Sequence, residues 1–124
     1  MKPYLDFYKA NEISPVRQDI SSLDDHFARR ESLYRHLGIV PSFVSGRKVI
    51  EFGPGSGHNA IYTSHLRPTR YVLVDANPTG LKETKENLHQ YGSKEVEHEV
   101  VDSTIEDFKT QEKFDLVLCE GVLP

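Results

Sequence analysis

The sequence predicts an open α/β fold built on a mostly parallel sheet. Four short apolar runs alternate with segments that carry helix start and stop signals. A glycine-rich turn also lies where the first apolar run ends and the next helical segment begins. Strands that alternate with helices favour a parallel sheet with right-handed crossovers.

The four apolar runs are the predicted strands and cover residues 48–52, 70–75, 96–101 and 114–119. The first, second and fourth are nearly continuous in Val, Ile, Leu and aromatic residues, which suits parallel strands covered on both faces. The third alternates apolar and acidic residues, as an edge strand does.

Helices are predicted between these strands over residues 57–66 and 78–91. The second of them has the clearer signals. Asn77 is a suitable N-cap, Pro78 occupies the first helical position and Gly92 is a suitable stop.

Residues 1–45 are predicted to form an N-terminal arm and helical cap, and residues 46–124 the partial binding domain. Residues 22–25 resemble a capping box that starts a helix, and Gly38 is a suitable stop. Residues 41–44 could open one further short turn. Four residues fall near one face of the cap helix at helical spacing: Leu23, Phe27, Tyr34 and Leu37.

Composition bounds the class of protein. The formal net charge is −4 and no stretch concentrates Lys and Arg, so nothing supports a nucleic-acid partner. Cys119 is the only cysteine, which suits a reducing cytosol. The sequence has neither a signal-peptide pattern nor an apolar stretch long enough to span a bilayer. We therefore expect a cytoplasmic protein without a membrane partner.

The glycine turn Gly53-Pro54-Gly55-Ser56-Gly57 carries the main functional signal. Glycines at a strand-to-helix junction allow a tight turn and a close approach to a ligand. Free N–H groups at the helix start can bind a carboxylate or phosphate. A structural reading, in which these glycines only make a turn, is the alternative.

Acidic residues close the second and third predicted strands. Asp75 follows the second strand and could accept hydrogen bonds from ribose hydroxyls, or could simply cap the following helix. Asp102 closes the third strand and is followed by Ser103. Parallel strands place these residues and the glycine turn along one crevice.

These segments resemble the motifs of class I S-adenosylmethionine-dependent methyltransferases. Residues 49–59 resemble motif I, residues 74–75 the second motif and residues 102–103 the third, while residues 114–120 resemble the fourth strand and its loop. The resemblance covers residues 45–124. It implies a Rossmann-like fold with strand order 3-2-1-4, flanking helices and an N-terminal helical cap, truncated after the fourth strand.

The resemblance also implies S-adenosylmethionine as cofactor and assigns residues to its parts. The glycines would contact the methionine part, Asp75 would hold the ribose hydroxyls and Asp102 would lie at the adenine edge. Glu51 and Glu120 would orient the methionyl amine and shape the sulfonium end. The complete set of expected cofactor-binding residues is Glu51, Gly53, Gly55, Gly57, Asp75, Ala76, Asp102, Ser103 and Glu120.

A nicotinamide cofactor is the less favoured alternative. Its fingerprint Gly-x-Gly-x-x-Gly would place the third glycine at position 58, where the chain has His58, and Gly57 comes one residue early. Glu51 would also be unfavourable beside a pyrophosphate and suits an amine. An NAD(P)-dependent oxidoreductase is therefore a weaker hypothesis than a methyltransferase.

The acceptor side is less defined. No residue can be assigned as a general base, and the six histidines show no metal-ligand spacing, so no metal is expected. Residues 119–124 lack the Asn/Asp-Pro-Pro-aromatic sequence of enzymes that methylate base amines or glutamine, which favours a small-molecule acceptor. A non-catalytic cofactor-binding module is the other open reading. We expect self-association as a homodimer through the exposed edge of the fourth strand.

Overall fold

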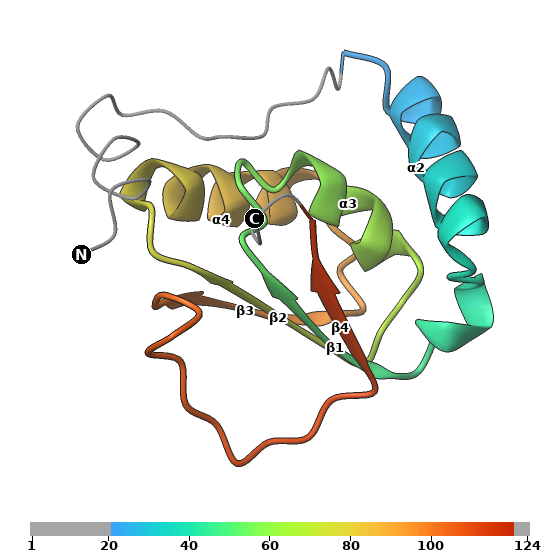
Figure 1. Cartoon of the computed structure of the whole chain (residues 1–124). Helices are drawn as coiled ribbons and strands as arrows, with labels where there is room; N and C mark the ends of the chain where they lie inside the picture. Colours follow the sequence, from blue (N-terminus) through green and yellow to red (C-terminus); the bar gives the residue numbers. More distant parts are fainter. Residues whose placement is uncertain (1–20, 121–124) are drawn as a thin grey trace.

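The computed structural model describes residues 21–120, and the predicted arm lies outside them. Four strands form one parallel sheet in the order β3-β2-β1-β4 (Figure 1). The strands are β1 (Lys48–Phe52), β2 (Arg70–Asp75), β3 (Glu97–Asp102) and β4 (Leu116–Cys119). The predicted α/β fold and strand order are therefore confirmed.

Three α-helices and one short turn of 3₁₀-helix accompany the sheet among the described residues. They are α2 (Leu23–Leu37), η1 (Pro41–Phe43), α3 (His58–His65) and α4 (Pro78–Tyr91). Ser22 caps α2 by accepting a hydrogen bond from the Asp25 amide, and Asn77 caps α4 through the Thr79 amide. These caps are the predicted ones.

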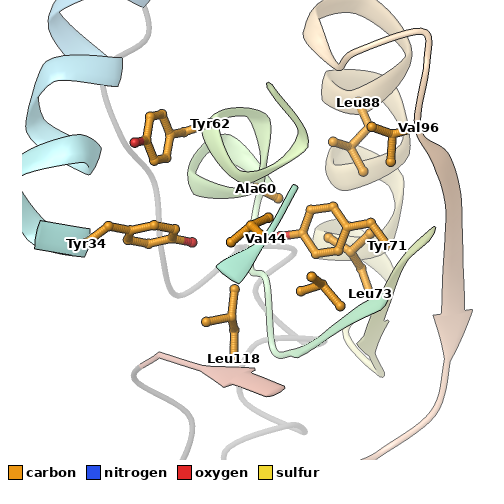
Figure 2. Close-up of a cluster of buried hydrophobic side chains, with 10 residues drawn as sticks. Tyr34, Val44, Ala60, Tyr62, Tyr71, Leu73, Leu88, Val96 and Leu118 are labelled. Carbon is orange, nitrogen blue, oxygen red and sulfur yellow. The ribbon is translucent and has the colours of Figure 1, made fainter. Parts of the chain in front are cut away.

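The main core lies between the helices and one face of the sheet. It combines aromatic residues of α2 and α3 with apolar residues of the strands and of α4 (Figure 2). Tyr34 and Tyr62 meet edge to face with ring centroids 5.3 Å apart. The residues of this cluster labelled in Figure 2 are Tyr34, Val44, Ala60, Tyr62, Tyr71, Leu73, Leu88, Val96 and Leu118.

The opposite face of the sheet is covered by the segment between β3 and β4. Ile50, Val72 and Val74 point to this face, and Phe108 packs edge to face against Phe52 at 5.7 Å. Figure 1 shows residues 103–115 running as a loop on the side of the sheet away from the helices. Alternate residues of β1 and β2 therefore enter different cores, as a doubly covered strand requires.

Three expectations about the cap helix and the fourth strand were wrong. Leu37, predicted on the buried face of the cap helix, is 57% exposed in the last turn of α2. β4 begins two residues later than predicted, and Asp115, just before it, bonds Lys48 through both its amide and its side chain. Val117 of β4 is 59% exposed, so this strand is covered on one face only. Self-association through the β4 edge and the division into cap and binding domain stay predictions.

Candidate cofactor site at the carboxyl edge of the sheet

The carboxyl ends of all four strands meet along one edge of the sheet. The register pairs Asp75 of β2 with Asp102 of β3, and Phe52 of β1 with Cys119 of β4. Glu120 therefore follows β4 beside Gly53, which follows β1. The parallel sheet thus places the predicted site residues along a single line from β3 to β4.

The glycine turn adopts the backbone that its sequence predicts. Gly53, Gly55 and Gly57 have φ angles of 69°, 66° and 82°, in the left-handed region that side chains disfavour. The Gly53 amide donates to the carbonyl oxygen of Val74 at 2.8 Å, which anchors the turn to β2. Gly57 is the N-cap of α3 and offers no side chain, and the His58 amide donates only a long bond of 3.5 Å to Oγ of Ser56.

Helix α4 holds the glycine turn from behind. The Thr84 hydroxyl donates to the carbonyl oxygen of Gly55 at 3.1 Å, and the Asn87 amide donates to that of Ser56 at 2.9 Å. A Cβ on Gly80 would lie 2.7 Å from the Gly55 carbonyl oxygen. This turn is therefore rigid and pressed closely onto α4, although the sequence analysis did not identify these three residues of α4. Gly80, in the first turn of that helix, is the signal that could have found them.

Asp75 lies beside the glycine turn with both carboxylate oxygens engaged by backbone amides. Oδ1 accepts from Ala76 at 2.8 Å and from Asn77 at 3.1 Å, while Oδ2 accepts a longer bond of 3.3 Å from Gly55. Burial raises the pKa of Asp75, and these three amides oppose that rise. The helix cap is Asn77, so the alternative reading of Asp75 as the N-cap is wrong. Oδ2, with its single long bond, retains acceptor capacity.

Asp102 and Ser103, the two predicted site residues at the end of β3, are more exposed than Glu51. Asp102 is exposed, while the amide of Ser103 donates to the carbonyl oxygen of Asp75 at 3.0 Å and the Ser103 hydroxyl donates to Thr104 at 2.8 Å. Ser103 is therefore part of the link between β3 and β2. Asp102 offers an accessible carboxylate at the same edge.

Glu51 is the most unusual ionisable group at this edge. It is 3% exposed on β1, and Oε1 accepts a hydrogen bond from the hydroxyl of Tyr71 on β2. Burial raises the pKa of Glu51 to about 7, with the Tyr71 hydrogen bond opposing and the charge of Glu120 adding to the rise. A buried carboxyl that titrates near neutral pH is suited to meet a cationic ligand group.

Helix α2 contributes a cation that the sequence analysis missed. Arg30 is 7% exposed, and its Nη2 donates to Oε2 of Glu120 at 2.8 Å. His26, four residues earlier, is fully buried, and its Nε2 donates a hydrogen bond of 2.7 Å to the carbonyl oxygen of His58. The spacing of His26, Arg30 and Tyr34 by four puts them on one helix face, although nothing in the sequence marks that face as buried.

A separate cavity lies elsewhere. It measures about 420 Å³ and lies between α4 and β3, lined by Lys85, Leu88, His89, Ser93, Lys94, Val96, His98 and Val100. None of the predicted site residues lines it. Among residues 21–120 no group of three or more His, Cys, Asp or Glu residues is arranged to hold a metal ion. No helix of the described part is long and apolar enough to cross a membrane.

Comparison with known protein families identifies the family of this chain. Residues 50–124 match the family described as the methyltransferase domain. The chain belongs to this family. The match covers the glycine turn and all four acids at the carboxyl edge, from Glu51 to Glu120.

Curated relatives of this methyltransferase domain act on different kinds of acceptor. It is 32% identical over 108 residues to the probable phthiotriol/phenolphthiotriol dimycocerosates methyltransferase 2 of Mycobacterium ulcerans, covering 86% of this chain and 40% of the relative. It is 28% identical over 114 residues to the ribosomal RNA small subunit methyltransferase G of Vibrio campbellii, covering 91% of this chain and 50% of the relative. The chain thus spans about half or less of the length of these relatives.

Solved structures of methyltransferases share the fold. The Arabidopsis thaliana protein arginine methyltransferase 10 superposes with a TM-score of 0.64 at 20% identity, covering 94% of this chain and 31% of that one. Phosphoethanolamine N-methyltransferase 1 of Haemonchus contortus, solved with phosphoethanolamine and S-adenosylhomocysteine, gives 0.62 at 16% identity, covering 95% and 24%. These likenesses establish the Rossmann-like methyltransferase fold.

Proposed function

We propose that this methyltransferase domain binds S-adenosylmethionine across the carboxyl edge of its sheet and serves transfer of the methyl group to a small-molecule acceptor. The observation that carries the proposal is the placement of Glu51, the glycine turn and Asp75 side by side at that edge. When bound, the cofactor would supply a methyl group already activated by a positively charged sulfur. The domain's own residues would bind and orient it.

The residues present fit the chemical groups of that cofactor. Oδ2 of Asp75 retains acceptor capacity for a ribose hydroxyl, and Asp102 offers a further carboxylate beyond it. Glu51 is a buried carboxyl with a single hydrogen bond among the described side chains, which suits an ammonium group. The glycine turn and the weakly capped start of α3 suit a carboxylate. A dinucleotide pyrophosphate would instead bring negative charge toward Glu51.

A small-molecule acceptor is favoured by the charge of the site. The carboxyl edge carries the carboxylates of Asp75 and Asp102 beside the buried Glu51, and the net charge of the chain is −4. An acidic edge repels a phosphate backbone. The 32% identity to the probable phthiotriol/phenolphthiotriol dimycocerosates methyltransferase 2 of Mycobacterium ulcerans agrees with this proposal.

RNA is the second candidate acceptor, supported by the similarity to the Vibrio ribosomal RNA methyltransferase. Incubation of the protein with S-adenosylmethionine carrying a labelled methyl group, together with either extracted lipids and metabolites or total RNA, separates the two. Label in the organic or small-molecule fraction supports our proposal. Label only in RNA refutes the small-molecule acceptor.

Calorimetry tests the cofactor itself. We expect S-adenosylhomocysteine to bind with one site per chain and NAD not to bind. Replacement Asp75→Ala should weaken the nucleoside interaction by at least about tenfold, because a charge-assisted hydrogen bond is lost. Tight binding of NAD with none of S-adenosylhomocysteine would refute the methyltransferase proposal.

A further inference from the structure

Helix α2 packs on the core through Phe27 and Tyr34, but it also buries two polar side chains. Its buried residues are His26, Arg30 and Tyr34, whereas Leu33 and Leu37 on the same helix are 38% and 57% exposed. Apolar side chains gain most from burial, so packing accounts for Phe27 and Tyr34 but not for His26 and Arg30. The burial of Arg30 therefore calls for a reason other than core formation.

Arg30 makes the contact that reaches farthest from α2. Its guanidinium bonds Glu120, ninety residues along the chain, and lies over the ring of Tyr34 at 5.1 Å from the ring centroid. The Arg30 side chain is 8% exposed and that of Glu120 is 31% exposed. Burial disfavours the charge of Arg30, yet the Glu120 bond and charge keep the pKa of Arg30 above its usual value.

An ion pair with one partner buried is a costly way to attach a helix. Desolvation of two charges offsets much of their attraction, and an apolar residue of similar size usually stabilises as well. The Nε of Arg30 has no hydrogen-bond partner within residues 21–120, which adds to the cost. The pair is better explained by the position in which it holds Glu120.

That position is one end of the candidate site. Asp75 and Asp102 occupy β2 and β3, whereas Glu120 follows β4 beside the glycine turn that follows β1. In the proposed binding mode the nucleoside lies toward β2 and β3. The amino-acid part then lies toward β1 and β4, under α2.

We propose that Arg30 is a positioning residue that holds Glu120 at the amino-acid end of the cofactor site and fastens the cap helix α2 over that end. This inference rests on the proposed function. It assigns a role in cofactor recognition to a helix that lies before residue 50, where the family match begins. Arg30 acts through Glu120, so its effect is confined to ligands that have an amino-acid part.

The experiment compares two ligands and three variants by calorimetry. S-adenosylhomocysteine carries the amino-acid part, whereas 5′-methylthioadenosine has the same adenosine and sulfur without it. In Arg30→Gln we expect S-adenosylhomocysteine to bind about tenfold more weakly, the size of effect for a lost charge-assisted contact, and 5′-methylthioadenosine within about twofold of the unchanged protein. Arg30→Lys should recover part of the loss.

Arg35→Gln is the matched control on the same helix. Arg35 pairs with Glu31 at 2.7 Å, but its side chain is 74% exposed, so both ligands should bind as before. Glu120→Gln should repeat the split seen with Arg30→Gln. The double variant should lose no more than either single one, because the two residues act as a unit.

The outcomes separate this inference from the proposed function. Equal weakening of both ligands in Arg30→Gln, together with a lower melting temperature, would mean that Arg30 only supports the fold and would overturn the inference. Unchanged binding of S-adenosylhomocysteine in that variant would also overturn it, while leaving the methyltransferase proposal intact. Failure of the unchanged protein to bind S-adenosylhomocysteine would instead refute the proposed function.

Discussion

The Tyr71 hydroxyl on β2 donates a hydrogen bond to Oε1 of Glu51 on β1, and both side chains are buried beside the glycine turn. Burial alone favours the neutral form of Glu51, whereas the bond from Tyr71 favours the carboxylate. This contact therefore increases the fraction of Glu51 that is ionised near neutral pH.

Replacement Tyr71→Phe should raise the pKa of Glu51 above about 7, because burial is then less opposed. More Glu51 is then protonated at pH 7, and the affinity for S-adenosylhomocysteine should fall about fivefold. The deficit should shrink as the pH rises to 8.5. Calorimetry between pH 6 and 8.5 measures this, with Tyr62→Phe as the control because Tyr62 packs in the same core without bonding Glu51. A deficit that does not depend on pH would contradict the role given to Tyr71.

Replacement Glu51→Gln should make the protein more stable while weakening the binding of S-adenosylhomocysteine. Folding raises the pKa of Glu51 from 4.5 to about 7, so the folded state binds the proton more tightly and stability falls as pH rises through that window. Above pH 7 the cost of the buried charge is fully present, on the order of 3 kcal/mol. Chemical denaturation should show a clear gain in Glu51→Gln at pH 8 and little at pH 4. A loss of stability in Glu51→Gln at pH 8 would show that the buried charge of Glu51 does not destabilise the fold.

Replacement Gly57→Ala should damage both fold and site. The φ angle of 82° strains any side chain, and the new Cβ would lie 2.7 Å from Cα of Thr84 on α4. Gly46→Ala is the matched control, since its φ of 73° is similar but nothing lies within 4 Å. We expect about 1–2 kcal/mol of destabilisation in the control and more in Gly57→Ala. Equal losses in the two variants would show that α4 does not press on the turn.

Arg70 should matter for stability but not for ligand binding. It bonds Glu97, Glu99 and Glu112 at the end of the sheet opposite the site, and thereby ties down the loop between β3 and β4. Hydrogen bonds from Arg70 and then Lys48 lower the pKa of Glu112 to about 2. Its contribution to stability is thus present above pH 4.5 and is lost as the pH falls toward 2.

Thermal unfolding checks the role of Arg70. Arg70→Gln should lower the melting temperature by a few degrees at low salt, with a smaller effect at high salt. Arg67→Gln should have little effect, because Arg67 and its partner Glu95 are both 68% exposed. A lower affinity for S-adenosylhomocysteine in Arg70→Gln at equal stability would contradict this separation of roles.

The sheet and its glycine turn were predictable because local signals and global topology agree there. Runs of β-branched residues mark the strands, and parallel strands must bring Gly53, Asp75 and Asp102 to one edge. The caps at Ser22 and Asn77 were predictable for the same reason, since their side chains bond amides only two or three residues away.

The contacts that cross between distant elements were not predictable. Arg30 reads from the sequence as a solvent-facing residue of an amphipathic helix, and its partner Glu120 is ninety residues away. The contact of Thr84 with Gly55 likewise depends on how α4 lies against the turn. Leu37 follows the helical period but is exposed, because periodicity shows which residues share a face and not which of them are covered.

Backbone amide NMR during titration with S-adenosylhomocysteine tests the central claim most directly. We predict that the largest chemical-shift changes fall on Gly53, Gly55 and Gly57 and on the amides that follow Asp75, with none around the cavity between α4 and β3. Changes centred on Lys85, His89 and Lys94 of that cavity, or no changes at all, would contradict a cofactor site at the carboxyl edge of the sheet.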